Sequence, residues 1–137
     1  AAVVQRPELF AAAICEVPLL DMLRYHHLKM AKYWLGELGD PDNPEHVPFL
    51  HAYSPYHNVK EGVPYPAVLL RTARNDTRVD PMHARKMTAR LQQATSSTRP
   101  VLLSVEDNAG HGAGKPVDQI TAAQADVYAF ITSILVD

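Results

Sequence analysis

The chain has 137 residues, 47% of them apolar and 20% charged, which is enough for one hydrophobic core and short for a two-domain enzyme. Its formal net charge of -2 offers no broad positive field, so a nucleic-acid partner is not expected. The longest apolar runs, residues 11–14 and 66–70, fall far short of the roughly 20 residues that cross a bilayer, so no membrane partner is expected either.

The cysteine content and the first residues bear on the cellular compartment. Cys15 is the single cysteine, so no disulfide can form within the chain. No basic segment followed by an apolar stretch has the pattern of a secretion signal. We therefore expect a cytoplasmic protein, with a periplasmic location left open, and Cys15 as an inert apolar side chain in a buried strand.

Short apolar runs alternate along the chain with longer helical patterns. A run without polar alternation is typical of a strand that is covered on both faces, and Pro at the first helical position favours a helix start. The predicted elements are the end of a helix at 1–6, a strand at 11–15, one or two helices within 21–38, a short helix capped by Asn43 and running toward Tyr53, a strand at 67–70, a helix at 81–97, a strand at 101–105, a glycine-rich loop at 108–115 and a helix at 116–136.

This order of elements predicts an α/β fold. Strands that alternate with helices of ten or more residues pair in parallel through right-handed crossovers. Ligands of such sheets collect beyond the carboxyl ends of the strands. The loops after the second and third predicted strands are therefore the first places to look for chemistry.

The loop after the second predicted strand contains two aspartates. Asp80 directly precedes Pro81, so its side chain is expected to cap the following helix. Asp76 has no such local role and can turn toward the neighbouring loop. An ordinary turn aspartate, bonded to its own backbone, fits Asp76 equally well.

The loop after the third predicted strand places His111 between Gly110 and Gly112. The glycines leave the imidazole unobstructed, which suits proton transfer near neutral pH. A histidine without function in a flexible loop is the alternative. A phosphate-binding loop is not expected, because the glycine spacing does not fit and Pro116 follows Lys115 where Ser or Thr is required.

An acid after one strand and a histidine after the next is the order in which the α/β-hydrolase fold supplies the last two members of a catalytic triad. The carboxylate orients the imidazole and offsets its charge, while the other ring nitrogen takes the proton of the nucleophile. The predicted α/β class and the order of Asp76 and His111 therefore both fit an α/β-hydrolase fold.

Six sequence segments, taken in chain order, carry a resemblance that covers almost the whole chain. They are residues 5–10 (QRPELF), 21–24 (DMLR), Trp34, 53–59 (YSPYHNV), 76–79 (DTRV) and 110–116 (GHGAGKP). Together they closely resemble the prolyl oligopeptidase family of serine peptidases, although no single segment would carry the match.

The resemblance implies roles for four side chains. Asp76 is the triad acid and His111 is the triad base. Arg78 matches the arginine that hydrogen-bonds a substrate carbonyl, and Trp34 matches the indole that stacks on the substrate proline ring. Without the resemblance, Arg78 fits a surface arginine paired with an acid, and Trp34 fits an ordinary core residue.

The resemblance also implies which residues line the substrate pocket and which reaction is catalysed. Val79 and Leu19 fall at positions that line the pocket for proline. Leu38 stands where the best-known members have a tyrosine, and Thr77 replaces an acidic residue often found beside the triad acid, so strict proline selectivity is in question. The implied activity is hydrolysis of short peptides on the carboxyl side of proline, with no cofactor.

The nucleophile of the family lies outside this sequence. Its Gly-x-Ser-x-Gly elbow would fall roughly eight residues before Ala1, and the chain contains no such motif. We expect residues 1–137 to be the C-terminal part of the catalytic domain, without the elbow, the earlier strands and the propeller domain, and to be inactive alone. The missing N-terminal part, or a second copy paired through the exposed sheet edge, is the expected protein partner. The alternative is a non-catalytic α/β interaction or structural module.

The seven histidines do not predict a metal site. His26 and His27 are adjacent in a predicted helix and are expected to point in different directions. The others form no ligand pattern with carboxylates or with the cysteine, so no metal is expected. They are His46, His51, His57 and His83, besides His111.

Overall fold

A computed structural model describes residues 1–107, 109–112 and 115–136. The sequence-predicted glycine-rich loop at 108–115 therefore lies partly outside the described residues. In chain order the elements, with η for 3-10 helices, are α1 (Ala2–Gln5), η1 (Pro7–Leu9), β1 (Ala12–Glu16), η2 (Tyr25–His27), η3 (Ala31–Trp34), α2 (Leu35–Leu38), α3 (Val47–Tyr53), β2 (Ala67–Ala73), α4 (Met82–Ala94), β3 (Val101–Glu106) and α5 (Val117–Leu135).

The three strands form a parallel sheet in the order β1-β2-β3, which confirms the predicted α/β class. Ala12 of β1 is paired with Ala67 of β2, and Val68 of β2 with Val101 of β3. All seven residues of the central strand β2 are buried. The turn after β2 is therefore anchored to the most enclosed strand of the sheet.

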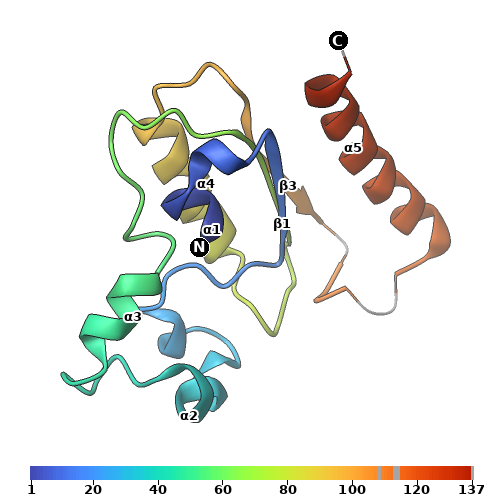
Figure 1. Cartoon of the computed structure of the whole chain (residues 1–137). Coiled ribbons are helices and arrows are strands. Elements are labelled where there is room, and N and C mark those ends of the chain that lie inside the picture. Colours follow the sequence, from blue (N-terminus) through green and yellow to red (C-terminus); the bar gives the residue numbers. More distant parts are fainter. Residues whose placement is uncertain (108, 113–114, 137) are drawn as a thin grey trace.

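Helices cover both faces of the sheet (Figure 1), because alternate residues of β2 point to opposite sides. Val68 and Leu70 pack on the side of α1 and α4. Ala67 and Leu69 pack against Phe130 of α5 on the other side. This two-sided burial explains why the strands read as apolar runs.

A second small core lies outside the sheet, within residues 19–53. Its buried members Met22, Tyr25, Ala31 and Leu50 hold together η2, η3, α2 and α3. One or two helices were expected over 21–38, and the structure instead has the three short helical elements η2, η3 and α2 in this segment. Lys29 adopts a left-handed φ of 51°, which interrupts a regular helix between η2 and η3.

Two helix starts differ in detail from the expectation. The predicted cap at Asn43 is wrong, since α3 begins at Val47 and the Asn43 side chain accepts the Glu45 N–H within a turn. The helix expected over 81–97 spans Met82–Ala94. Asp80 Oδ1 accepts the Met82 N–H at 2.9 Å, so this aspartate does bind a free amide at the start of α4.

The strand β2 continues three residues beyond the predicted 67–70, because the charge of Arg71 is compensated inside the structure. Its guanidinium donates to Glu16 and lies 3.1 Å from Glu106, on the two neighbouring strands. In β1, burial raises the pKa of the Cys15 thiol, which keeps this side chain protonated. Within the described residues, no helix combines the length and apolar character needed to cross a bilayer.

Candidate active site

The carboxylate of Asp76 is held in a fixed orientation by the turn that follows β2. The side chain is fully buried. Oδ1 accepts two backbone N–H groups of the same turn, from Arg78 at 2.8 Å and from Val79 at 2.9 Å. These bonds satisfy one carboxylate oxygen and leave Oδ2 to face the neighbouring loop.

His111 meets that free oxygen. Its Nδ1 lies 2.8 Å from Oδ2 of Asp76, and its side chain is 29% exposed. An ionised carboxylate only accepts hydrogen bonds, so Nδ1 carries the proton and Nε2 presents a lone pair. The pair therefore has the arrangement that a general base requires.

Three contacts between the loops after β2 and β3 bring this acid and base together. Arg74 Nε donates to Asp107 at 2.6 Å, and the Arg74 N–H donates to the Glu106 carbonyl at 2.8 Å. The Asn75 side chain donates to the Asp107 carbonyl at 3.2 Å. The loops thus lie side by side at the carboxyl edge of the sheet, as expected for an α/β site.

The substrate-binding residues expected from the resemblance form a second group. The guanidinium carbon of Arg78 lies 5.7 Å from the centre of the Trp34 ring, within cation–π range. Trp34, Leu19 and Leu38 pack against the same small core around Tyr25. Asp76 connects this group to the acid–base pair, because it binds the backbone of Arg78.

Val79, which was also expected to line the pocket, lies in the turn that holds Asp76. Its side chain is 7% exposed, and its N–H donates to Asp76. The half-buried Trp34 is neither a fully buried core residue nor a free surface residue. The structure therefore brings Asp76 to His111 and Arg78 to Trp34, and it places Leu19 on the Trp34 core.

A cavity of about 240 Å³ opens beside the loop that carries His111. Its walls include Glu16, Arg71 and Glu106 from the three strands, together with Lys115. These charges are paired with one another, since Lys115 Nζ lies 2.6 Å from Glu106 and Arg71 bridges Glu106 and Glu16. The apolar surroundings of Trp34 suit a proline ring better than the charged walls of this cavity do.

The sequence analysis missed a buried polar cluster around Asp21. This side chain is 1% exposed and binds Lys86, while its backbone N–H donates to Nδ1 of His83 at 3.2 Å. Burial opposes ionisation of Asp21, but the ammonium of Lys86 outweighs it and the pKa of Asp21 is lowered. These partners are distant in sequence, so only the DMLR segment pointed to Asp21.

The same cluster contains a serine, a histidine and an aspartate, but it is not a second triad. Ser54 Oγ lies 2.8 Å from Nδ1 of His57, and the same nitrogen lies 3.8 Å from Asp21. A triad needs the serine and the acid on different ring nitrogens. Ser54 is also fully buried, so a substrate has no access to its hydroxyl.

Comparisons with known proteins support the fold described above. A sequence profile described as the prolyl oligopeptidase family matches residues 1–136. The chain belongs to the prolyl oligopeptidase family. A prolyl endopeptidase of Elizabethkingia meningoseptica is 40% identical over 131 residues, which are 95% of this chain and 19% of that protein. The chain thus spans about a fifth of the length of such prolyl oligopeptidase relatives.

Solved structures of the family superpose closely on the chain. A prolyl endopeptidase structure is 46% identical, with a TM-score of 0.95 over 98% of this chain and 20% of that one. Prolyl oligopeptidase B of Galerina marginata, with a peptide substrate bound, is 34% identical, with a TM-score of 0.92 over 98% of this chain and 19% of that one. That protein has been solved in separate variants with alanine replacing a serine, an aspartate or a histidine. The superposition shows the α/β-hydrolase fold of prolyl oligopeptidase catalytic domains.

Proposed function

We propose that this chain supplies the acid and the base of a serine peptidase triad, with Asp76 as the acid and His111 as the base. The observation that carries the proposal is the 2.8 Å contact between Oδ2 of Asp76 and Nδ1 of His111. Nε2 of His111 takes the proton of an attacking serine hydroxyl and returns it to the leaving amine. The buried carboxylate stabilises the imidazolium that forms between these two steps.

The proposed substrate is a short peptide that is cleaved on the carboxyl side of proline. Trp34 offers a flat apolar face on which a compact proline ring can stack, and Leu19 packs on the same small core. Val79, from the turn that holds Asp76, is proposed to line the same pocket because of the family resemblance. Arg78 donates to a carbonyl of the bound peptide and keeps the chain in register. Leu38, on the Trp34 core, gives this pocket an aliphatic wall, which loosens the selection for proline.

The nucleophilic serine is proposed to come from residues outside this chain, so the isolated chain would be inactive. No Gly-x-Ser-x-Gly motif occurs in the 137 residues. The second candidate, a non-catalytic α/β module, rests on the same observation. In that case Asp76 and His111 would stabilise the loops without serving catalysis.

The decisive experiment uses the whole protein that contains the chain, purified as wild type and as the His111→Ala variant. Hydrolysis of a chromogenic Gly-Pro amide should greatly exceed that of the matching Gly-Ala amide, and His111→Ala should abolish it. A fluorophosphonate probe should label the whole protein and leave the isolated chain unlabelled. Unchanged hydrolysis in the His111→Ala variant would exclude the proposed role of the base, and no labelling of the whole protein would favour the non-catalytic module.

A further inference from the structure

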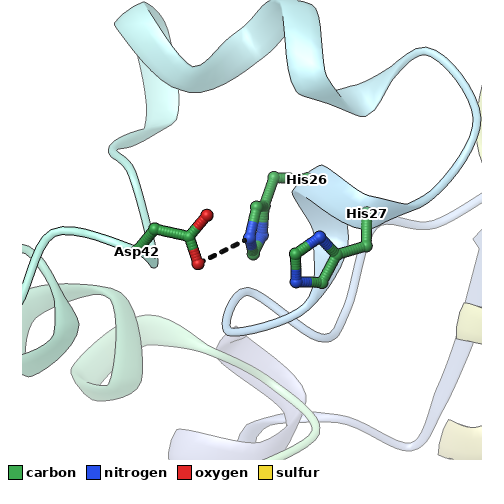
Figure 2. Close-up of side chains that lie close together, drawn as sticks. All are labelled: His26, His27 and Asp42. Carbon is green, nitrogen blue, oxygen red and sulfur yellow. Dashed lines mark hydrogen bonds and ion pairs between the residues drawn. The ribbon is translucent and has the colours of Figure 1, made fainter.

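His26, His27 and Asp42 lie close together on segments that surround the small second core (Figure 2). Both histidines project from η2, and the carboxylate faces them from the loop before α3. The expectation that the two histidines point in different directions is wrong, since their ring centres lie only 3.7 Å apart. His27 is the last residue of η2, and the extended Leu28 follows it, so regular helical spacing does not continue past this pair.

We propose that these three side chains form a binding site for a divalent transition-metal ion, specifically Zn²⁺. One ligand atom of each residue lies within 4.8 Å of the other two. Two imidazoles and a carboxylate suit zinc and leave a fourth position for water. Mg²⁺ and Ca²⁺ prefer oxygen ligands throughout and should not compete for the site.

The best-defined pair already has the spacing of two zinc ligands. Nε2 of His26 lies 3.3 Å from Oδ1 of Asp42. Two atoms bound about 2.1 Å from zinc at a tetrahedral angle lie about 3.4 Å apart. His27 is exposed, so its ring is free to turn and close the remaining distance.

The burial of His26 is the second observation that points to a ligand. The ring side chain is 6% exposed, and Nδ1 has no hydrogen-bond partner within the described residues. A buried imidazole that makes one hydrogen bond to an exposed carboxylate is poorly compensated for its lost hydration. Coordination through Nε2 would replace the single 3.3 Å hydrogen bond of this ring with a stronger metal–nitrogen bond and would keep Asp42 as a neighbouring ligand. It would also use His27, whose ring makes no hydrogen bond in the described part of the chain.

Zinc at this position would tie η2 to the loop before α3. Both segments flank the core that holds Trp34, so the metal would brace the elements around this side chain. This role does not depend on the proposed peptidase activity. The readout is therefore metal binding itself.

The test is isothermal titration of Zn²⁺ into the metal-free whole protein, with Co²⁺ absorption as a report on the coordination geometry. We expect His27→Ala and Asp42→Asn each to weaken the binding by about tenfold or more. His51→Ala, which removes an exposed histidine from α3, is the matched control and should bind like the wild type. Mg²⁺ should give no heat at the same concentrations.

Asp42→Asn replaces a side chain that is 72% exposed, so this variant should fold even if a histidine variant does not. Circular dichroism of each variant checks this point. The proposal is overturned if Asp42→Asn and a folded His27→Ala bind zinc as tightly as the wild type. An equal loss in His51→Ala would also overturn it, because the binding would then be unspecific.

Discussion

Nδ1 of His111 lies 2.8 Å from Oδ2 of Asp76, although the two residues are 35 positions apart in the chain. Parallel pairing of β2 and β3 accounts for this meeting, because their carboxyl ends reach the same edge of the sheet. The acid is fully buried and the base is partly exposed. In the proposed mechanism, a substrate therefore approaches the imidazole while the carboxylate stays out of water.

Asp76→Asn in the whole protein should reduce kcat by about 10⁴-fold, because an amide no longer selects the correct tautomer of His111. The rate of Gly-Pro amide hydrolysis measures this effect. Asp118→Asn is the matched control, since it changes an exposed carboxylate in the first turn of α5. A loss smaller than about tenfold in Asp76→Asn would contradict the assignment of the triad acid.

Trp34→Ala should lower the preference for proline over alanine before the cleaved bond by about 10-fold or more, because the apolar face for the ring is removed. The ratio of kcat/KM values for the Gly-Pro and Gly-Ala amides reports the preference. Tyr33→Ala provides the control, since Tyr33 is the preceding aromatic residue and is 70% exposed. An unchanged ratio in Trp34→Ala would place the proline pocket elsewhere.

The stability of the protein should decrease as the pH falls below about 6.5, the ordinary pKa of histidine. Burial lowers the pKa of His83, so the unfolded chain takes up a proton that the folded chain resists, and acid favours unfolding. Protonation of His83 would also remove the acceptor of the Asp21 N–H. The lowered pKa of Asp21 adds a further loss below about pH 4.

Denaturant unfolding at a series of pH values measures this dependence, which amounts to at most about 1.4 kcal/mol per pH unit for each proton. His83→Gln keeps an acceptor for the Asp21 N–H and should flatten the curve between about pH 5 and 6.5. Arg85→Gln changes an exposed arginine on the same helix and should leave the curve unaltered. If both variants retain the wild-type slope, His83 is not the titrating group.

Gly39→Ala should destabilise the second core by about 1–3 kcal/mol, because Gly39 has a φ of 106° that a residue with a Cβ rarely adopts. The added Cβ would also lie 2.6 Å from the ring of Phe49. Gly36→Ala is the internal control, since its Cβ meets nothing within 4 Å and it lies in α2. Thermal unfolding should show a loss for Gly39→Ala only, and equal melting temperatures for the two variants would contradict the prediction.

The sheet and the two long helices could be predicted because local sequence determines them. Apolar runs identified all three strands, and Pro81 with Asp80 marked the start of α4. The order of Asp76 and His111 after successive strands then predicted that they would meet. In each case the signal lies within one segment or follows from the topology alone.

The remaining features depend on contacts between distant segments, which no local pattern contains. The strand β2 extends past Leu70 because Arg71 binds Glu16, 55 positions away. The approach of the His26 and His27 rings to 3.7 Å depends on side-chain conformations that helical periodicity does not reveal. A single-sequence reading therefore predicts that Asp76 and His111 meet, but it does not find the buried network or the candidate zinc site.

The two backbone amides that bind Oδ1 of Asp76 have a consequence for the timing of catalysis. They lie two and three residues further along the same turn, so they orient the carboxylate whether or not His111 is in contact with it. The rotational entropy of this side chain is lost once, when the protein folds. Under the proposed triad assignment, each catalytic cycle begins with a carboxylate that needs no reorganisation, so that of this pair only the imidazole has to align.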